Sequence, residues 1–323
     1  MIDIKHLNKS DLSIIPKRDV NSNKGTYGHL LIIAGSEGMA GAAYLSALAA
    51  YRMGAGLVRI YTAHANLVPL QTLLPEAIID TYEPDDFDIY INSDKAQGLE
   101  DYVATSRADI RSKMDGLLSW IDIVSKLEEL ISWATTIVIG PGLSTSDYAR
   151  VLVEKTMVAS RVPTIIDADA LNIIAAHPSL KDLYKPNMII TPHIGEMERL
   201  TKLSKDAILS DMIRVATAYA NKYHITCHLK SSRSITASGD AVYEIDVQAP
   251  ALSKAGSGDV LTGIIAGLLC LKLSPSKATA LGAYIHALSG VEAKKKYGEH
   301  GVLARDIAHA TTEVLKHMEN GHD

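Results

Sequence analysis

The stretch LSKAGSGDVLTGIIAGLLCL, residues 252–271, places an aspartate between a Gly-Ser-Gly turn and a run of mostly apolar residues. The run is shorter than the roughly 20 residues that a membrane-spanning helix needs, so it predicts a buried helix of a globular protein. Gly256, Ser257 and Gly258 have little side chain to block the first backbone N–H groups of that helix. Because these N–H groups and the helix dipole favour negative charge, the stretch predicts an anion site with Asp259 beside it.

Asp259 has two interpretations at this position. It could only complement the helix dipole. It could also accept the proton of an attacking hydroxyl, since phosphoryl transfer needs a base for the hydroxyl and donors for the charge on the transferring group. We expect the helix N-terminus to lower the basicity of Asp259, so that it orients the hydroxyl and accepts the proton late. Residues 230–234, KSSRS, follow a predicted strand and offer hydroxyls, N–H groups and cations suited to the phosphates of a nucleotide.

Before this stretch, β-rich and helical segments alternate along the chain. HLLIIAG (29–35) and GLVRIYTA (56–63) flank an Ala/Leu-rich segment, and TTIVIG, VPTIID and NMIITPH are each followed by helical sequence. This rhythm with apolar strands predicts an α/β three-layer sandwich: a mostly parallel central sheet with helices on both faces. HITCHLKSS and the pair SITAS and AVYEI, joined by Gly-Asp, add a strand and a hairpin at one edge. The chain is predicted to end in helices.

One segment departs from this rhythm. Residues 80–101 are acidic with a single lysine, and residues 110–133 have helical spacing. We interpret residues 80–133 as an insertion with a mobile acidic part and a docked helix. Since no repeat, low-complexity tract or Pro/Gly-rich linker divides the chain, residues 1–323 are expected to form a single domain.

The composition indicates an ordinary globular protein. The chain has 323 residues, of which 47% are hydrophobic and 21% charged, enough to bury one large core or two smaller ones. Its net charge of -5 provides no general attraction to nucleic acid or anionic membranes, so small-molecule partners are expected. Cys227 and Cys270 lie far apart beside apolar residues, which predicts buried thiols. The charged N-terminus lacks the apolar core of a secretory signal, and we expect a cytoplasmic protein.

Two glycine-containing turns are weaker candidates for ligand contacts. In GSEGMAG, Gly35, Gly38 and Gly41 lie between a strand and a helix, where backbone N–H groups could approach a phosphate. Their spacing is not that of a dinucleotide fingerprint, and the glycines could instead serve tight packing. GPGLS, residues 140–144, follows a predicted parallel strand, at the edge where ligands gather in open α/β sheets.

Polar residues also follow two neighbouring predicted strands, in DADALN (167–172) and TPHIGE (191–196). The two stretches contain five such side chains: Asp167, Asp169, Asn172, His193 and Glu196. Because the carboxyl ends of parallel strands meet at one edge, we expect these side chains to lie close together. Asp169 could instead cap a helix. His193 lies in a loop with proline and glycine, and we expect it to contact a ligand.

Taken in order, six stretches resemble the nucleotide-dependent NAD(P)H-hydrate dehydratases, a family of the ribokinase-like superfamily: KGTYGHLLIIAGSEGMAGAAYLSALAAYRMGAGLV, IGPGL, IDADALN, TPHIGE, LKSS and AGSGDVLTGIIAGLL. The resemblance runs from about residue 24 to the C-terminal helices, apart from residues 80–133. It implies a ribokinase-like fold and a metabolite-repair reaction. ADP or ATP would phosphorylate the hydroxyl of the hydrated nicotinamide ring of NADHX or NADPHX, and phosphate would then leave to regenerate NADH or NADPH.

The resemblance also implies roles for individual residues. Ala42, Gly142, His193 and Asp259 would bind the hydrate, and Asp259 would be the catalytic carboxylate. The adenine nucleotide would contact two sets of residues: Lys230, Ser231, Ser232, Arg233 and Ser234, and the anion site of Gly256, Ser257 and Gly258. Glu196 and Asn172 resemble the acid and the amide that the wider superfamily uses near magnesium, which makes Mg²⁺ an expected cofactor. The family further implies a homo-oligomer, a tetramer.

The sequence departs from the family pattern at two places. Lys254 and Ala255 replace the usual Thr-Gly before the Gly-Ser-Gly-Asp turn, and Ser144 replaces the last glycine of GPGLG. Two other functions therefore stay open. One is a ribokinase-like kinase of a vitamin-precursor alcohol, which would stop at a stable phosphate ester. The other is a nucleotide-binding regulatory protein without catalysis, which Lys254 makes conceivable.

Overall fold

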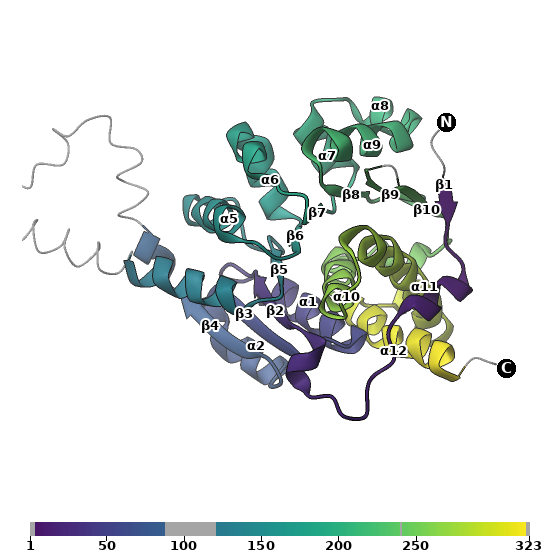
Figure 1. The fold of residues 1–323 in the computed structure, drawn as a ribbon, viewed down its shortest axis with the longest axis horizontal. Coiled ribbons are helices and arrows are strands. Elements are labelled where there is room, and N and C mark those ends of the chain that lie inside the picture. Colours follow the sequence, from purple (N-terminus) through teal and green to yellow (C-terminus); the bar gives the residue numbers. More distant parts are fainter. Residues whose placement is uncertain (1–3, 88–120, 240, 321–323) are drawn as a thin grey trace, which may run out of the picture.

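The structure, a computed structural model, describes residues 4–87, 121–239 and 241–320. Its centre is one sheet of ten described strands (Figure 1). From edge to edge the strands are β1 (Ile4–His6), β10 (Ala241–Ile245), β9 (Ser234–Ser238), β8 (Thr226–Leu229), β7 (Met188–Ile190), β6 (Thr164–Ile166), β5 (Thr136–Ile139), β2 (His29–Ile33), β3 (Leu57–Ala63) and β4 (Ile78–Tyr82). Among these, only β9 runs antiparallel to its neighbours, so the predicted mostly parallel sheet is confirmed.

Helices cover both faces of the sheet, as the alternating apolar strands predict (Figure 1). One layer contains α1 (Ala40–Met53), α2 (Leu67–Leu73), α10 (Ser257–Cys270), α11 (Pro275–Gly301) and α12 (Ala304–Asn320). The other contains a helix over residues 121–133, α5 (Asp147–Ala159), α6 (Asp169–Ala176), α7 (Ile194–Thr201), α8 (Lys205–Ser210) and α9 (Met212–Tyr223). Along β2, Leu30 and Ile32 enter the first core and Leu31 and Ile33 the second. The period-2 alternation of a strand thus divides its side chains between two cores.

The apolar helix of the opening stretch is α10, and the prediction that it is buried is confirmed. It packs against α1 at short range through two glycines. A Cβ at Gly263 would lie 2.2 Å from the carbonyl oxygen of Ser46, and one at Gly267 would lie 2.5 Å from Cβ of Met53. Only glycine fits such an approach of two helices, which fixes α10 beside α1 and directs its N-terminus to the edge of the sheet.

The described part of the chain contains no helix both long and apolar enough to cross a membrane. Cys227 and Cys270 are buried free thiols, as predicted, and burial raises the pKa of each to about 12.

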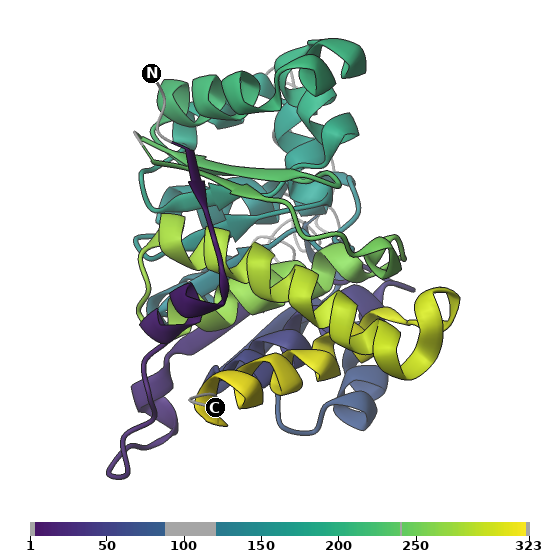
Figure 2. The ribbon, with the colours of Figure 1, turned by 90° about the vertical axis from the view of Figure 1, so that its right-hand side faces the viewer.

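Two segments differ from the expectations. The acidic segment does not begin outside the sheet, because Asp80 lies within the edge strand β4 and pairs with Arg59 of β3. The N-terminal segment forms β1, which runs parallel to β10 beyond the predicted hairpin (Figure 2). The expected docked helix is present over residues 121–133, where Leu127 and Leu130 are buried. The expectations for residues 88–120 lie outside the described residues.

Candidate active site

The carboxyl ends of β6, β7 and β8 meet the N-terminus of α10 at one edge of the sheet, and four charged side chains converge there. Asp167 follows β6, Glu196 lies in the first turn of α7, Lys230 follows β8 and Asp259 lies in the first turn of α10. The Lys230 ammonium is 2.8 Å from Oδ1 of Asp167 and 3.9 Å from Oε2 of Glu196. We call these four residues, with Thr262 of α10, the Lys230 cluster.

Two carboxyl groups of the Lys230 cluster are hard to ionise. Burial raises the pKa of Asp259 to about 7, and the negative charge of Asp167 adds to this rise while Lys230 opposes it. Burial, with a smaller contribution from Asp167, also raises the pKa of Glu196 to about 7. The expectation that the helix end lowers the basicity of Asp259 is therefore wrong. Removal from water and neighbouring carboxylates outweigh the helix dipole.

Asp167 and Lys230 hold each other in the charged state. Burial opposes the charge on both, but their mutual attraction and hydrogen bond dominate, lowering the pKa of Asp167 and raising that of Lys230. Asp167 is 1% exposed, and its second oxygen accepts a hydrogen bond of 2.8 Å from Oγ1 of Thr262. Thr262 was absent from the sequence-based prediction. Its only sequence signal is its place one helical turn after Asp259, which puts the two side chains on the same face of α10.

The segment predicted to bind an anion forms a glycine-capped helix end. Gly256 has a left-handed φ of +84°, and a Cβ there would lie 2.5 Å from Cδ1 of Leu45, so the turn requires glycine. A Cβ on Gly258 would lie 3.7 Å from the Lys230 ammonium, which places that cation against the first turn of α10. The hydroxyl of Ser257 is turned inward and lies 3.1 Å from Nε2 of buried His286. An anion bound at this helix end would therefore meet backbone N–H groups and Lys230 rather than the serine hydroxyl.

The residues of the KSSRS turn divide between two places. Lys230 belongs to the Lys230 cluster, and its backbone N–H donates to the carbonyl of Pro192. Ser234 closes the turn, because its hydroxyl donates to the carbonyl of Ser231 at 2.9 Å. The guanidinium of Arg233 pairs with Glu244 of β10. Contact of Ser231, Ser232, Arg233 and Ser234 with a nucleotide stays a prediction.

His193 caps α7. Its Nδ1 accepts hydrogen bonds from the backbone N–H groups of Gly195 at 2.9 Å and Glu196 at 3.4 Å, while Glu196 accepts from the N–H of His193 at 2.8 Å. This reciprocal capping box was missed, although His-x-x-Glu has its spacing. Burial and the charge of Lys230 lower the pKa of His193, so the ring is neutral with its proton on Nε2. This nitrogen lies 3.4 Å from Oε1 of Glu196, and 54% of the His193 side chain is exposed, so a ligand could reach the ring beside that carboxylate.

The GPGLS loop packs against the start of α1 and brings two predicted residues together. A Cβ at Gly142, whose φ is +59°, would lie 2.9 Å from Cβ of Ala42. Ser144 adopts a left-handed φ of +68°, which explains the glycine usual in the family at this position. Its N–H donates to Asp169 at 2.9 Å. Asp169 follows the N-cap Ala168, so it ties this loop to α6 instead of capping the helix.

Lys254, the other departure from the family pattern, does not enter the anion site. Its ammonium donates to the backbone carbonyl of His300, near the end of α11, at 2.9 Å. Lys254 therefore gives no reason to expect a catalytically inactive protein.

The two residues predicted near magnesium differ in their suitability. Oδ1 of Asn172 accepts a hydrogen bond of 2.9 Å from Nε of Arg199, so this oxygen is already used. Within the described ranges, no group of three or more His, Cys, Asp or Glu residues could hold a metal ion. Protein sites for nucleotide-bound Mg²⁺ commonly supply only one or two carboxylates, with phosphates and water as the other ligands. Glu196 fits such a limited role better than Asn172, because its second oxygen, Oε1, lies outside the bond to the backbone N–H of His193, whereas the single amide oxygen of Asn172 already accepts from Arg199.

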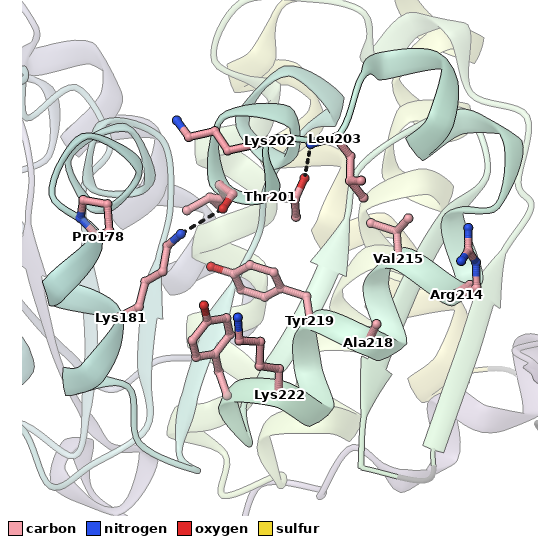
Figure 3. A pocket seen from close by; sticks show the side chains of 12 residues that line it. Pro178, Lys181, Thr201, Lys202, Leu203, Arg214, Val215, Ala218, Tyr219 and Lys222 are labelled. Carbon is pink, nitrogen blue, oxygen red and sulfur yellow. Dashed lines mark hydrogen bonds between the residues drawn. The ribbon is translucent and has the colours of Figure 1, made fainter.

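A separate hollow of about 480 Å³ lies at the opposite end of α7 (Figure 3). The hollow is bounded by the segment 178–183, the C-terminal end of α7, and α9. The Lys181 ammonium, which lines it, donates a hydrogen bond of 2.8 Å to the carbonyl of Leu200. None of the predicted site residues lines it. The candidate active site is therefore the edge formed by the Lys230 cluster, where the chemically suited groups converge.

Sheet order, helical layers and this edge define an α/β protein of the ribokinase-like class. The structure is similar to that of a ribokinase-like superfamily protein from Enterococcus faecalis, with a TM-score of 0.76 and 23% identity, covering 97% of this chain and 95% of that one. The sequence model of the NAD(P)H-hydrate dehydratases matches residues 30–313. The chain belongs to this family.

Named relatives agree with this assignment. The ADP-dependent (S)-NAD(P)H-hydrate dehydratase of Listeria monocytogenes is 31% identical over 311 residues, which cover 94% of this chain and 92% of the relative. The bifunctional NAD(P)H-hydrate repair enzyme of Moorella thermoacetica is 33% identical over 308 residues, 95% of this chain and 53% of the relative. The chain thus spans about half the length of the bifunctional relatives it matches. The ADP/ATP-dependent NAD(P)H-hydrate dehydratase of Bacillus subtilis, co-crystallised with ATP and Mg²⁺, has a TM-score of 0.74 and 26% identity, covering 98% and 99% of the two chains.

Proposed function

We propose that this chain is a nucleotide-dependent NAD(P)H-hydrate dehydratase, which uses ADP or ATP to return NADHX or NADPHX to NADH or NADPH. The observation that carries the proposal is Asp259, a carboxyl group with its pKa raised to about 7, placed in the first turn of α10 beside the Lys230 ammonium. A base with a pKa near the working pH is best suited to take a proton during reaction.

The chemistry has two steps. In the first, the ring hydroxyl oxygen bonds to the terminal phosphorus of the nucleotide, the bond from that phosphorus to the rest of the nucleotide breaks, and the hydroxyl proton passes to Asp259. Lys230 and the first N–H groups of α10 stabilise the charge on the transferring group. In the second, the carbon–oxygen bond breaks with its electron pair on phosphate, and loss of a ring proton completes the double bond of the reduced nicotinamide.

The surrounding residues bind and orient the reactants. Ala42 and Gly142 form one wall for the hydrate, and the Nε2–H of His193 is a donor for its polar groups. The loops around Lys230 and Gly258 hold the nucleotide phosphates. Mg²⁺, when bound with the nucleotide, offsets phosphate charge, and Glu196 is the residue that would hold it. A single-domain, cytoplasmic homotetramer completes this proposal.

A single optical assay tests the function. The purified protein is mixed with NADHX or NADPHX and either ADP or ATP, and the absorbance of the reduced nicotinamide is followed. We expect this absorbance to return. Nucleotide consumption without its return would instead identify a kinase that stops at the phosphate ester, and nucleotide binding without consumption would identify a regulatory protein.

A further inference from the structure

Asp167 has no step in the chemistry above, although it is the most deeply buried carboxylate of the Lys230 cluster. Each of its oxygens is fixed by a different element. Oδ1 accepts from Lys230, at the end of β8, and Oδ2 accepts from Thr262, in α10, both at 2.8 Å. A buried carboxylate held at both oxygens has a fixed orientation, and so does the cation that it binds.

We propose that Asp167 is a positioning residue, which holds the Lys230 ammonium against the first turn of α10, where it meets the phosphoryl group in transfer. This inference rests on the proposed function, because it assigns a role within the same reaction. Asp167 itself touches no reacting atom and acts through Lys230.

The position of the ammonium depends on Asp167 because the rest of the lysine side chain is flexible. The backbone of Lys230 is fixed by its hydrogen bond to Pro192, but four rotatable carbons separate that backbone from the charge. Glu196 lies 3.9 Å from the ammonium and competes for it. Without the charge of Asp167, the ammonium would shift towards Glu196 and lose its fixed place beside Gly258.

Thr262 connects the same carboxylate to α10. It is one helical turn beyond Asp259, so its bond to Asp167 ties the segment of α10 that carries the base to the carboxylate that orients the cation. The helix segment that carries the base and the cation that faces the base are thereby both bound to one buried side chain.

A double-mutant cycle separates positioning from simple stabilisation. Lys230→Met should lower kcat by about 10²- to 10³-fold, as expected for loss of a group that stabilises transition-state charge. Asp167→Asn should lower kcat by about 10- to 100-fold, the range for groups that orient another functional group, and leave the KM for NADHX within about threefold. In the Lys230→Met background, Asp167→Asn should have almost no further effect on kcat. If the double variant instead loses kcat by the product of the two single-variant factors, the two residues act independently and the proposal is wrong.

Asp167→Asn could fail to fold, because loss of one partner of a buried ion pair is strongly destabilising. Thr262→Val retains both charges and removes only the hydroxyl. It should lower kcat by about threefold to tenfold, and this effect should also vanish in the Lys230→Met background. Thr279→Val is the matched control, since Thr279 is a buried helical threonine whose hydroxyl bonds to Pro275 in α11. An equal loss of kcat in both threonine variants would contradict positioning.

The design also distinguishes failure of this inference from failure of the proposed function. If the wild-type protein does not restore the reduced-nicotinamide absorbance, the proposed function is wrong. The same cycle is then read from ADP affinity by calorimetry, where Asp167→Asn should weaken binding only while Lys230 is present. Independent effects on ADP affinity would overturn the positioning role, whatever reaction the protein performs.

Discussion

Two clusters of charged residues lie in different parts of the molecule and differ in their balance of positive and negative charge. The Arg59 cluster joins β3, β4 and the helix 121–133, and it contains Arg59, Asp80, Lys126 and Glu129. It has two cations and two carboxylates, with Asp80 in contact with both cations at 2.9 and 3.1 Å. In the Lys230 cluster one ammonium group faces three carboxylates.

The pKa directions show the consequence of this difference. Burial raises the pKa of Asp80, but its two cationic partners outweigh burial and lower it, so the charged forms of Asp80, Arg59 and Lys126 are all favoured. In the Lys230 cluster, Lys230 satisfies Asp167, while the pKa of Glu196 and that of Asp259 rise to about 7. Balanced charges stabilise a fold, whereas an excess of buried charge of one sign leaves groups ready to exchange a proton.

The largest effect that we expect is the loss of turnover in Asp259→Asn. The substitution preserves the size of the side chain and removes the basic oxygen, so kcat should fall by about 10²- to 10⁴-fold. Nucleotide affinity should stay the same or rise slightly, because a negative charge near the phosphates is lost. Single-turnover kinetics and calorimetry measure the two quantities. An Asp259→Asn enzyme at full speed would show that Asp259 only complements the helix dipole.

The raised pKa of Asp259 also predicts the acid limb of the pH profile. Asp259 acts as a base only when ionised, and its pKa of about 7 means that the ionised fraction falls as the pH drops below that value. The value of kcat/KM should therefore fall about tenfold per pH unit below about pH 7. His193 stays neutral above its lowered pKa and does not oppose this trend. A profile that is flat down to about pH 5 would contradict it.

The sequence allowed the fold and the positions of the site loops to be predicted, but not the charge balance. The apolar run after Asp259 and the alternation of strands and helices are local patterns, which can be read from residues adjacent in sequence. For this reason α10 and the central strands were predicted correctly. The strand β4 was missed because Asp80 looks unfit for a sheet until Arg59 and Lys126 neutralise it. The raised pKa of Asp259 likewise depends on Asp167, which is distant in sequence. Contacts between remote segments determine such properties, and no local pattern contains them.

The Arg59 cluster should respond to loss of a carboxylate by losing stability. Asp80→Asn removes the negative charge between two cations in a side chain that is 13% exposed. We expect the free energy of unfolding to fall by about 1–3 kcal/mol, as for a partly buried group that loses its partner. The value of kcat should stay within about twofold. Chemical denaturation measures the first quantity and the optical assay the second. A large loss of kcat in a folded Asp80→Asn variant would show that the two clusters are coupled.

The smallest effect that we expect has the opposite sign. The pKa of Asp259 in the folded protein is raised to about 7 from its ordinary value of 3.8, so the protonated form is favoured by folding. This contribution to stability is fully present below the unfolded pKa and is lost as the pH rises through about 7. Above that pH, Asp259→Asn replaces an unfavourable buried charge with a neutral amide.

The Asp259→Asn variant should therefore be more stable than the wild type at about pH 8, by on the order of 1 kcal/mol or more, and nearly equal to it at about pH 4, with the difference growing as the pH rises between about 4 and 7. Chemical denaturation at the two pH values measures the difference, with Asp80→Asn as the control that is destabilised at both. Destabilisation of Asp259→Asn at about pH 8 would mean that its carboxylate is balanced in the way that Asp80 is. A gain in stability from a substitution that abolishes turnover would instead indicate that the excess of negative charge in the Lys230 cluster is retained for catalysis at a cost to the fold.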